Sequence, residues 1–254
     1  MKVGSAEARR KDIVEKVKQQ GFVSVDNLAK AFDTSEVTIR KDLATLSSRG
    51  VILRQMGGAV PMPLGVVSTD AAPAKSHLGE AAASLVSDNQ KLIIDCGSTT
   101  AALVPFLHRF SSLIVMTNAL SVANVLTASD AEPTVLMTGG TWDANSQSFQ
   151  GTMAEKLVSA YNYDVAFIGA SGIDVERGTT TLNELTGLTR AMADAATTVV
   201  IMAESSKVKN KMPNVELSWD KVSVLITDDQ LSDAHRKIIE QHGVEVITAA
   251  SKGV

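Results

Sequence analysis

The sequence has little cysteine, little histidine and no long hydrophobic run, and each absence excludes a class of protein. The single cysteine, Cys96, rules out an intramolecular disulfide and indicates a reducing compartment. No stretch of about 18 apolar residues is present to span a membrane, and residues 1–5 lack the apolar core of a signal peptide. We therefore expect a soluble, cytoplasmic protein that has no membrane partner.

Motifs for metal and nucleotide chemistry are also missing. The four histidines are scattered and lack metal-ligand spacing with Cys96. There is no Gly-x-x-x-x-Gly-Lys-Ser/Thr segment to cradle a nucleotide phosphate. Cys96 has no evident histidine partner, so a small buried side chain is its simplest interpretation. We expect no metal, no other cofactor and no catalytic residue.

Charge is unevenly distributed along the 254 residues. Residues 1–60 contain 11 Lys/Arg and 7 Asp/Glu, a net charge of +4. Residues 61–254 contain 13 Lys/Arg and 21 Asp/Glu, a net charge of −8. A small basic segment joined to a larger acidic one suggests that the first segment binds a polyanion and the second does not.

Three helices are predicted within the first 50 residues, because apolar residues recur there at helical spacing between capping signals. A serine precedes each helix, and a glycine follows the first and the third. The candidate N-caps are Ser5, Ser24 and Ser35, and the terminating glycines are Gly21 and Gly50.

The third helix has two distinct faces. Ile39, Leu43 and Leu46 share one narrow face that should pack inward. Lys41 and Thr38 lie on the outward side, where a cation and hydroxyls suit contacts with phosphates and base edges. Residues 51–60 follow as a predicted β-hairpin whose two central glycines permit a tight turn. A plain three-helix bundle with a solvated polar face remains the alternative.

This order of features resembles the winged helix-turn-helix of the DeoR/GlpR family of bacterial regulators. The match runs through Ser35, residues 38–43, Leu53-Arg54 and residues 57–59. The resemblance implies binding to double-stranded operator DNA as a homodimer or homotetramer. Asp42 either orients a neighbouring arginine or touches DNA. The DNA contacts that carry over from the family are Ser35, Thr38, Arg40, Lys41 and Arg54.

A proline-containing connector and an α/β domain are predicted after the hairpin. Residues 61–74 hold three prolines and read as an inter-domain linker between domains 1–60 and 75–254. Helices then alternate with Val/Ile/Leu-rich strands, which predicts a mostly parallel sheet covered on both faces. The predicted strands are 91–96, 113–117, 134–137, 165–169, 198–202, 222–227 and 244–247, and the predicted helices are 101–107, 120–127 and 235–242.

Hydroxyl, glycine and charged residues gather where these strands end. Ligands bind at the carboxyl ends of parallel strands, and such residues suit a phosphate and sugar hydroxyls. Each loop taken alone is equally well explained as turn chemistry, since Gly, Ser and Thr are common turn residues. Their recurrence at equivalent positions favours a polyol-phosphate pocket. The candidate effector ligands are Asp95, Gly97, Ser98, Thr99, Thr100, Thr117, Asn118, Gly139, Gly140, Ser171, Gly172, Glu184 and Lys207.

This second half resembles the sugar-phosphate sensor domain of the same family, which is similar in fold to ribose-5-phosphate isomerase. The resemblance implies a repressor of a carbohydrate or polyol operon, controlled by a phosphorylated sugar or polyol. Residues 137–141 and 180–184 look most like repressors of hexitol operons, such as glucitol operons. Two alternatives stay open: an activator, or an isomerase-like enzyme with Asp95 or Glu184 as base, although its Lys-Gly-Gly-Gly segment is missing.

Overall fold

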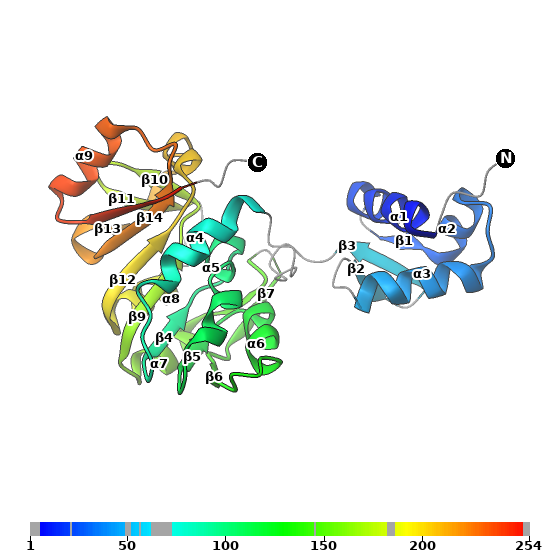
Figure 1. The fold of residues 1–254 in the computed structure, drawn as a ribbon, viewed down its shortest axis with the longest axis horizontal. Coiled ribbons are helices and arrows are strands. Elements are labelled where there is room, and N and C mark those ends of the chain that lie inside the picture. The colour runs from blue at the N-terminus through cyan, green and yellow to red at the C-terminus, as the bar shows by residue number, and fades with distance from the viewer. Residues whose placement is uncertain are drawn as a thin grey trace. The chain divides into compact units, whose positions relative to one another are not determined.

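The computed structural model describes residues 6–20, 22–48, 52–55, 57–61, 73–144, 146–181 and 186–250 (Figure 1). The chain divides into two compact units, Met1–Ser68 and Thr69–Val254. Each unit has its own hydrophobic core, so each is described by itself. No helix in the described ranges is both long enough and apolar enough to cross a membrane.

The first unit contains three helices and a small antiparallel sheet. The helices are α1 (Ala6–Gln20), α2 (Val25–Ala31) and α3 (Glu36–Ser48). The strands β1 (Val23–Ser24), β2 (Ile52–Gln55) and β3 (Gly58–Pro61) pair in the order β1-β3-β2. The predicted hairpin is confirmed as β2 and β3, which makes the unit a winged helix-turn-helix.

The predicted faces and caps of these helices are confirmed where the structure describes them. Ile39 and Leu43 are fully buried and Leu46 is 4% exposed. The Ser24 hydroxyl accepts a hydrogen bond from the Asn27 amide, 3.2 Å away. The predicted roles of Ser5, Gly21 and Gly50 fall outside the described residues.

β1 was not predicted, because two residues are too short to show a strand period. It adds to the wing through β3, where Ser24 pairs with Gly58. A Cβ at Gly58 would lie 2.4 Å from the Val23 carbonyl oxygen, so only glycine lets β3 approach β1 this closely. The wing is thereby tied to the start of α2.

A seven-stranded parallel sheet forms the centre of the second unit. Its strand order is β15-β14-β12-β9-β4-β5-β6, and every pair of neighbours is parallel. Residues 165–168 of β9 are all buried, and because successive side chains face opposite sides, both faces are covered. The strands are β4 (Lys91–Ile94), β5 (Ile114–Thr117), β6 (Thr134–Met137), β9 (Tyr163–Gly169), β12 (Ala196–Met202), β14 (Val224–Asp228) and β15 (Glu245–Ala249).

Helices pack on this sheet along its whole width. α4 packs against β14 and β15, α8 against β12, and α6 against β5 and β6. The helices are α4 (Pro73–Ala83), α5 (Ser98–Ala101), α6 (Leu120–Thr127), α7 (Thr152–Ser159), α8 (Gly187–Asp194) and α9 (Asp233–Gln241), with 3-10 turns η1 (Val104–Arg109), η2 (Ser205–Lys209) and η3 (Trp219–Lys221).

One predicted helix is wrong. Residues 101–107 were expected to be helical, but α5 starts earlier, at Ser98, and ends at Ala101, and η1 follows it. Pro105 explains the break, because proline has no amide hydrogen and disfavours α-helical geometry in the residue before it. The helix therefore opens directly on the loop after β4.

Two small antiparallel sheets were not predicted. The first has the order β10-β11-β13, formed by β10 (Gly172–Asp174), β11 (Gly178–Thr181) and β13 (Asn214–Ser218). The second is a hairpin of β7 (Thr141–Asp143) and β8 (Ser148–Gln150). These strands have only three to five residues, which is too few to show a clear period, and β11 and β13 also pair across a long stretch of sequence. Both small sheets contribute to the site described below.

Candidate functional site

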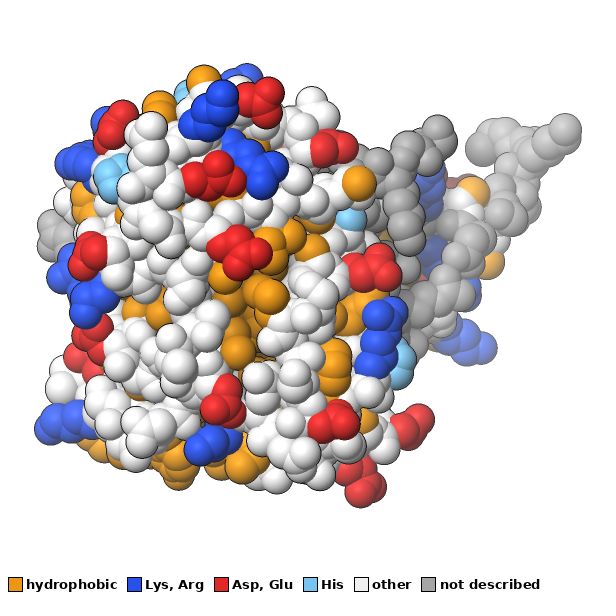
Figure 2. Space-filling model, turned by 60° about the vertical axis from the view of Figure 1, so that its left-hand side comes forward, with side chains coloured by type: hydrophobic (Ala, Val, Ile, Leu, Met, Phe, Trp, Pro, Cys, Tyr) orange, Lys and Arg blue, Asp and Glu red, His pale blue; other side chains and the backbone are white. Residues whose placement is uncertain are grey.

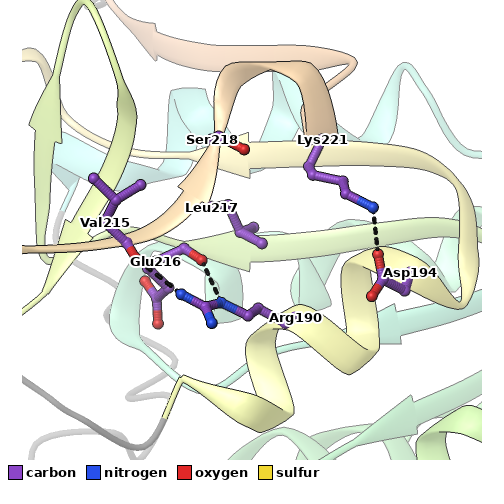
Figure 3. A pocket seen from close by; sticks show the side chains of 7 residues that line it. All are labelled: Arg190, Asp194, Val215, Glu216, Leu217, Ser218 and Lys221. Carbon is purple, nitrogen blue, oxygen red and sulfur yellow. Dashed lines mark hydrogen bonds and ion pairs between the residues drawn. The ribbon is translucent and has the colours of Figure 1, made fainter.

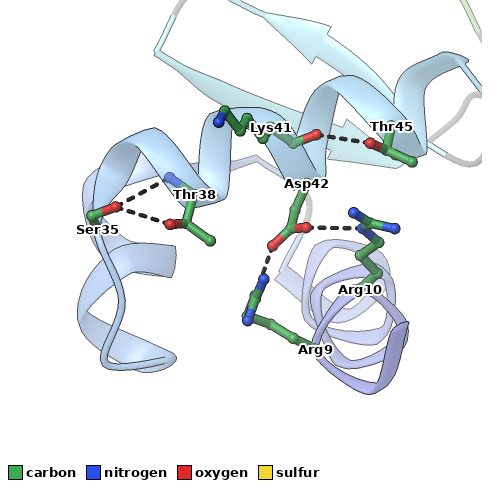
Figure 4. A network of polar contacts seen from close by, with 7 residues as sticks. All are labelled: Arg9, Arg10, Ser35, Thr38, Lys41, Asp42 and Thr45. Atoms are coloured by element: carbon green, nitrogen blue, oxygen red, sulfur yellow. Dashed lines mark hydrogen bonds and ion pairs between the residues drawn. The ribbon is translucent and has the colours of Figure 1, made fainter. Parts of the chain in front are cut away.

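The outward side of α3 carries the predicted DNA-contacting groups (Figure 4). The Ser35 hydroxyl caps the helix by accepting from the Thr38 amide at 3.2 Å, and it also bonds the Thr38 hydroxyl at 2.9 Å. Lys41 is exposed, and its side chain points away from the arginines of α1. Arg40 forms an ion pair with Glu36 at 2.7 Å, with both side chains about half exposed. Contact with a phosphate would have to compete with this pair.

Asp42 is a structural residue. Its side chain is 2% exposed, and its two carboxyl oxygens accept hydrogen bonds from the Nε atoms of Arg9 and Arg10 at 2.7 and 2.8 Å. This network holds α1 against α3 (Figure 4). Of the two roles that the sequence left open for Asp42, orientation of neighbouring arginines is the one observed. Arg9 and Arg10 were not singled out, because their position beside α3 depends on packing.

The wing carries the fifth predicted DNA contact. Arg54 lies on β2, where it pairs with Ala59 of β3. In the described part of this unit, the predicted contacts therefore come from two elements: Ser35 to Lys41 from the start of α3, and Arg54 from the hairpin.

The second unit has a cavity of about 290 Å³ at the carboxyl ends of β4 and β9. The chain runs from β4 outward to β5 and β6 on one side, and from β9 to β12, β14 and β15 on the other. The strand order therefore reverses between β4 and β9, and ligands bind at such a switch point in open α/β sheets. The small sheet and the β7–β8 hairpin complete the wall.

Seven predicted effector ligands lie on this wall: Asp95, Gly97, Ser98, Thr99, Thr100, Ser171 and Lys207. Gly97 has φ = +130°, a backbone conformation that favours glycine. The Thr100 hydroxyl donates to the carbonyl oxygens of Asp95 at 2.8 Å and Gly97 at 3.0 Å. That hydroxyl fixes the shape of the loop, which leaves Ser98 and Thr99 as the hydroxyls nearer a ligand.

Five other predicted ligands lie off the wall. Thr117 and Asn118 are fully buried beneath it, where the Asn118 amide donates to Asp95 at 3.1 Å. Gly172 is enclosed in β10, because a Cβ there would meet the Asn210 carbonyl oxygen at 1.9 Å. Gly139 and Gly140 belong to the connection before β7, and Gly140 packs on the backbone of Gln150, which does line the cavity. Glu184 falls outside the described residues.

Two charged wall residues were missed. Lys75, in the first turn of α4, donates to the Ser98 hydroxyl at 2.8 Å and lies 3.5 Å from a Glu204 carboxyl oxygen. In the sequence, Lys75 follows the prolines of the linker and was therefore placed at a domain boundary. Nothing in the sequence indicates that α4 packs against the loop after β4. Glu216 comes from β13, a strand that was not predicted. The remaining wall residues are Cys96, Ser146, Gln150, Gly169, Ala170, Thr181 and Thr189.

The two carboxyl groups on the wall are electrostatically unusual. Burial raises the pKa of Asp95, although hydrogen bonds from the Cys96 amide and Asn118 oppose this effect. Burial, and then the charge of Asp95, raises the pKa of Glu216 to about 7. Burial also raises the pKa of the Cys96 thiol, so it is not an activated nucleophile. Among the described residues, no cluster of three His, Cys, Asp or Glu could hold a metal ion.

Glu216 also borders a second hollow of about 240 Å³ between α8 and β13 (Figure 3). There Arg190 donates through Nε to the Glu216 carbonyl oxygen and through Nη2 to that of Val215, both at 3.1 Å. Lys221 pairs with Asp194 at 2.8 Å. The cations of this hollow are therefore engaged by the protein itself, and the first cavity is the better candidate for a ligand.

Charged side chains are distributed over one face of the molecule rather than confined to one site. On the face shown in Figure 2, acidic and basic side chains are interspersed, and hydrophobic side chains lie at the floor of a central hollow. The excess of negative charge in residues 61–254 is therefore mixed with basic groups on this face rather than gathered in one patch.

Solved structures are similar to part or most of the chain. The chain is similar to ribose 5-phosphate isomerase A from Methanocaldococcus jannaschii, with a TM-score of 0.38 and 15% identity over 53% of each chain. It is also similar to a translation initiation factor eIF-2B from Pyrococcus horikoshii, with a TM-score of 0.43 and 13% identity over 89% of this chain and 90% of that chain. Likeness at this level gives no basis for an activity.

Sequence relatives span nearly the whole chain. A putative aga operon transcriptional repressor of Escherichia coli O157:H7 is 31% identical, over 97% of this chain and 95% of the relative. The regulator GlpR of Haloferax volcanii is 30% identical, over 96% and 98%. An L-fucose operon activator of Haemophilus influenzae is 31% identical, over 92% and 97%.

Family models match both units. Residues 9–62 match the DeoR-like helix-turn-helix domain, and residues 70–229 match the DeoR C terminal sensor domain. The matches follow the order expected from the sequence and cover the winged unit and the unit with the cavity. The chain belongs to the DeoR family of transcriptional regulators.

Proposed function

We propose that this regulator is a repressor of a carbohydrate or polyol utilisation operon and that a phosphorylated sugar or polyol controls it. The observation that carries the proposal is the cavity at the switch point, where Lys75, Lys207 and the Ser98 hydroxyl lie on one wall. Cations and hydroxyls placed together suit a phosphate. The relatives named as repressors, including that of the aga operon, support the same direction of control.

We propose that residues 1–60 bind operator DNA, that 61–74 connect the domains and that 75–254 sense the effector. Ser35, Thr38, Arg40 and Lys41 of α3 would contact the major groove and its phosphates, and Arg54 the adjoining backbone. A homodimer or homotetramer would present two such helices to two half-sites. The motivation is the exposed position of Ser35, Arg40 and Lys41 at a helix whose other face is packed.

In the cavity, Lys75 and Lys207 would bind the phosphate, and Asp95 and Ser171 the hydroxyl-bearing part of the ligand. Asn118 lies behind this wall and would position Asp95, to which its amide donates, whereas Thr117 accepts from the Ala119 amide. Because Lys75 already bonds Ser98, a bound phosphate would replace or bridge that contact at 2.8 Å. Effector binding would thus act on the first turn of α4 and shift the population of the DNA-competent state.

Operator binding tests the DNA half of the proposal. DNA from upstream of the gene should bind the full chain at low salt, measured by fluorescence anisotropy. Lys41→Ala should weaken this binding by about 1 kcal/mol or more and lower its salt dependence, because one phosphate contact is lost. Effector binding by the variant should persist. Lack of any binding by the wild-type chain at low salt would reject the proposal.

Ligand binding tests the sensor half. A thermal-shift screen of sugar and polyol phosphates should find a stabilising ligand, since binding to the native state alone raises its stability. Lys207→Ala should then weaken the phosphorylated ligand more than its dephosphorylated analogue. Unchanged discrimination would remove Lys207 from the phosphate site, and a screen without any stabilising phosphate ester would remove the sensor assignment.

A further inference from the structure

The parallel sheet of the second unit differs between its two edges. At one edge, Arg236 donates through Nη2 to the Val246 carbonyl oxygen of β15 at 3.1 Å. This carbonyl points away from the sheet, because the neighbouring amide of Glu245 donates inward to the Ser223 carbonyl oxygen. A side chain of the same chain therefore already engages the backbone of this edge strand.

β6 forms the other edge of the sheet (Figure 1). The amides of Thr134 and Thr138 point inward, because they donate to carbonyl oxygens at the two ends of β5, at 2.9 and 3.1 Å. Successive backbone groups point to alternate sides of a strand, so the amide and carbonyl groups of Val135 and Met137 point away from β5. Within the described part of the chain, these outward groups have no hydrogen-bond partner.

The segment that contains this edge is poor in charge. Residues 110–154, which include β5, α6, β6 and the β7–β8 hairpin, contain three acidic residues and no Lys or Arg, whereas 20% of the whole chain is charged. Two of its large apolar side chains are exposed. Leu120, at the start of α6, is 40% exposed, and Trp142, on the hairpin that follows β6, is 43% exposed. Few charges and an exposed aromatic side chain are typical of the core of a protein–protein interface.

A second copy of β6 fits this edge by symmetry. When the strand pairs antiparallel with itself about a two-fold axis beside Leu136, Val135 lies opposite Met137 of the second copy. Both residues direct their backbone groups outward, so each such pair can exchange two N–H···O bonds. Pro133, which has no amide hydrogen, lies beyond these pairs and costs none of their bonds. Leu136 meets its own copy as an apolar cross-strand pair.

We propose that this protein assembles through β6, which pairs with β6 of a second copy and joins the two parallel sheets into one. The inference rests on the proposed function only for the choice of partner, because two operator half-sites call for two copies of the chain. The interface is isologous, since the same strand is used by both copies. Because the segment has few charges, the association should depend little on salt.

Analytical ultracentrifugation of the full chain, without DNA or effector, measures the assembly. We expect the wild-type chain to have twice the 26.8 kDa of one chain, or a multiple of that dimer. Met137→Pro removes an outward amide and leaves the pairing with β5 intact, so the dissociation constant of the dimer should rise about tenfold or more. Thr248→Pro, which removes an outward amide of β15, is the matched control and should leave the dissociation constant unchanged.

Cysteine cross-linking tests the register. Leu136→Cys places two thiols across the axis, where the Cα atoms of a non-hydrogen-bonded pair lie about 4.5 Å apart, within reach of a disulfide. Mild oxidation should therefore link two chains. Thr134→Cys, at a more exposed position on the same face of β6, should not link, because its two copies would lie about 13 Å apart along the strands. The wild-type chain, whose only cysteine is Cys96, should also stay unlinked.

Circular dichroism shows whether Met137→Pro is folded, and the cross-linking comparison decides if it is not. Three results would each overturn this inference alone: a wild-type chain that remains monomeric, a folded Met137→Pro variant that assembles like the wild type, or a Leu136→Cys variant that links no faster than Thr134→Cys. Failure of the chain to bind operator DNA would instead reject the proposed function and leave the β6 interface in place.

Discussion

At the scale of single residues, Asp42 and Glu216 are two recessed carboxyl groups with opposite surroundings. Asp42 accepts charged hydrogen bonds from Arg9 and Arg10. Glu216 accepts from a neutral hydroxyl and lines the same cavity as the carboxyl group of Asp95, which raises its pKa. The first charge is compensated inside the protein and should stabilise the fold. The second is compensated only in part, because the Thr189 hydroxyl and the charge of Arg190 oppose the rise in the pKa of Glu216 that burial and Asp95 cause.

Loss of the Asp42 charge should loosen the DNA-binding unit. Asp42→Asn removes the negative charge and replaces one acceptor oxygen with an NH2 group that faces an arginine, and we expect a loss of about 2–3 kcal/mol in the free energy of opening. Hydrogen-exchange mass spectrometry on the full chain measures this loss in α1 and α3 peptides. Asp26→Asn is the control, because the Asp26–Lys30 pair is exposed and contributes little. Equal effects of the two variants would contradict the structural role of Asp42.

Glu216 should make the second unit less stable as pH rises. Its pKa is raised from the ordinary value of 4.5 to about 7 in the folded protein. Between these values the folded state holds a proton that the unfolded state has lost, so stability falls with rising pH. Glu216→Gln removes this dependence and should stabilise the unit by about 2 kcal/mol at about pH 8, with the gain vanishing below about pH 4.5. Urea unfolding followed by tryptophan fluorescence checks this, and a pH-independent difference would contradict it.

At the scale of elements, α4 is attached to the loop that lines the cavity. Lys75 bonds Ser98, and one turn later Gly79 lies against the same segment, where an added Cβ would be 2.0 Å from the Ala102 carbonyl oxygen. Positions i and i+4 share a helix face, so one face of α4 makes both contacts. Displacement of the loop by a ligand would therefore be transmitted to α4.

A methyl group at Gly79 should separate α4 from this loop. Gly79→Ala places a carbon against backbone that cannot move aside, and we expect a loss of about 1–3 kcal/mol in stability despite the better helix propensity of alanine. Effector affinity should fall with it. Ser76→Ala, on the same helix, should leave both quantities nearly unchanged. Urea unfolding and calorimetry measure the two quantities, and a stabilised Gly79→Ala variant would show that the contact is not tight.

The elements differ in how far the sequence predicts them. The faces of α3 follow from helical period, and the strands of the parallel sheet follow from their apolar composition. Residues 101–107 were predicted as one helix from their apolar residues, whereas Pro105 divides this segment between α5 and η1. β11 and β13 pair over more than thirty residues, and such pairing leaves no local signal. Glu216 was missed for that reason, and Lys75 because only the packed structure brings α4 to the β4 loop.

At the scale of the whole molecule, DNA and effector should influence each other equally. If the effector lowers operator affinity by about tenfold, operator DNA must lower effector affinity by the same factor, because binding free energies are linked. Calorimetric titration of effector with and without operator DNA, at one salt concentration, measures this factor. The Lys41→Ala variant is the control, at a DNA concentration too low for this variant to bind. Its affinity for the effector should be the same with and without the DNA. Unequal factors for the wild-type chain would mean that a third equilibrium, such as assembly, intervenes.

The hydrogen bonds of Arg190 have a consequence for solubility. β13 is the edge strand of its small sheet, and an open edge is a template onto which a strand of another chain can add. Arg190 already uses two carbonyl oxygens of this strand, those of Val215 and Glu216. The guanidinium group thus occupies hydrogen-bond acceptors that the backbone of an added strand would need. The same strand that brings an acidic group to the cavity is in this way protected from aggregation.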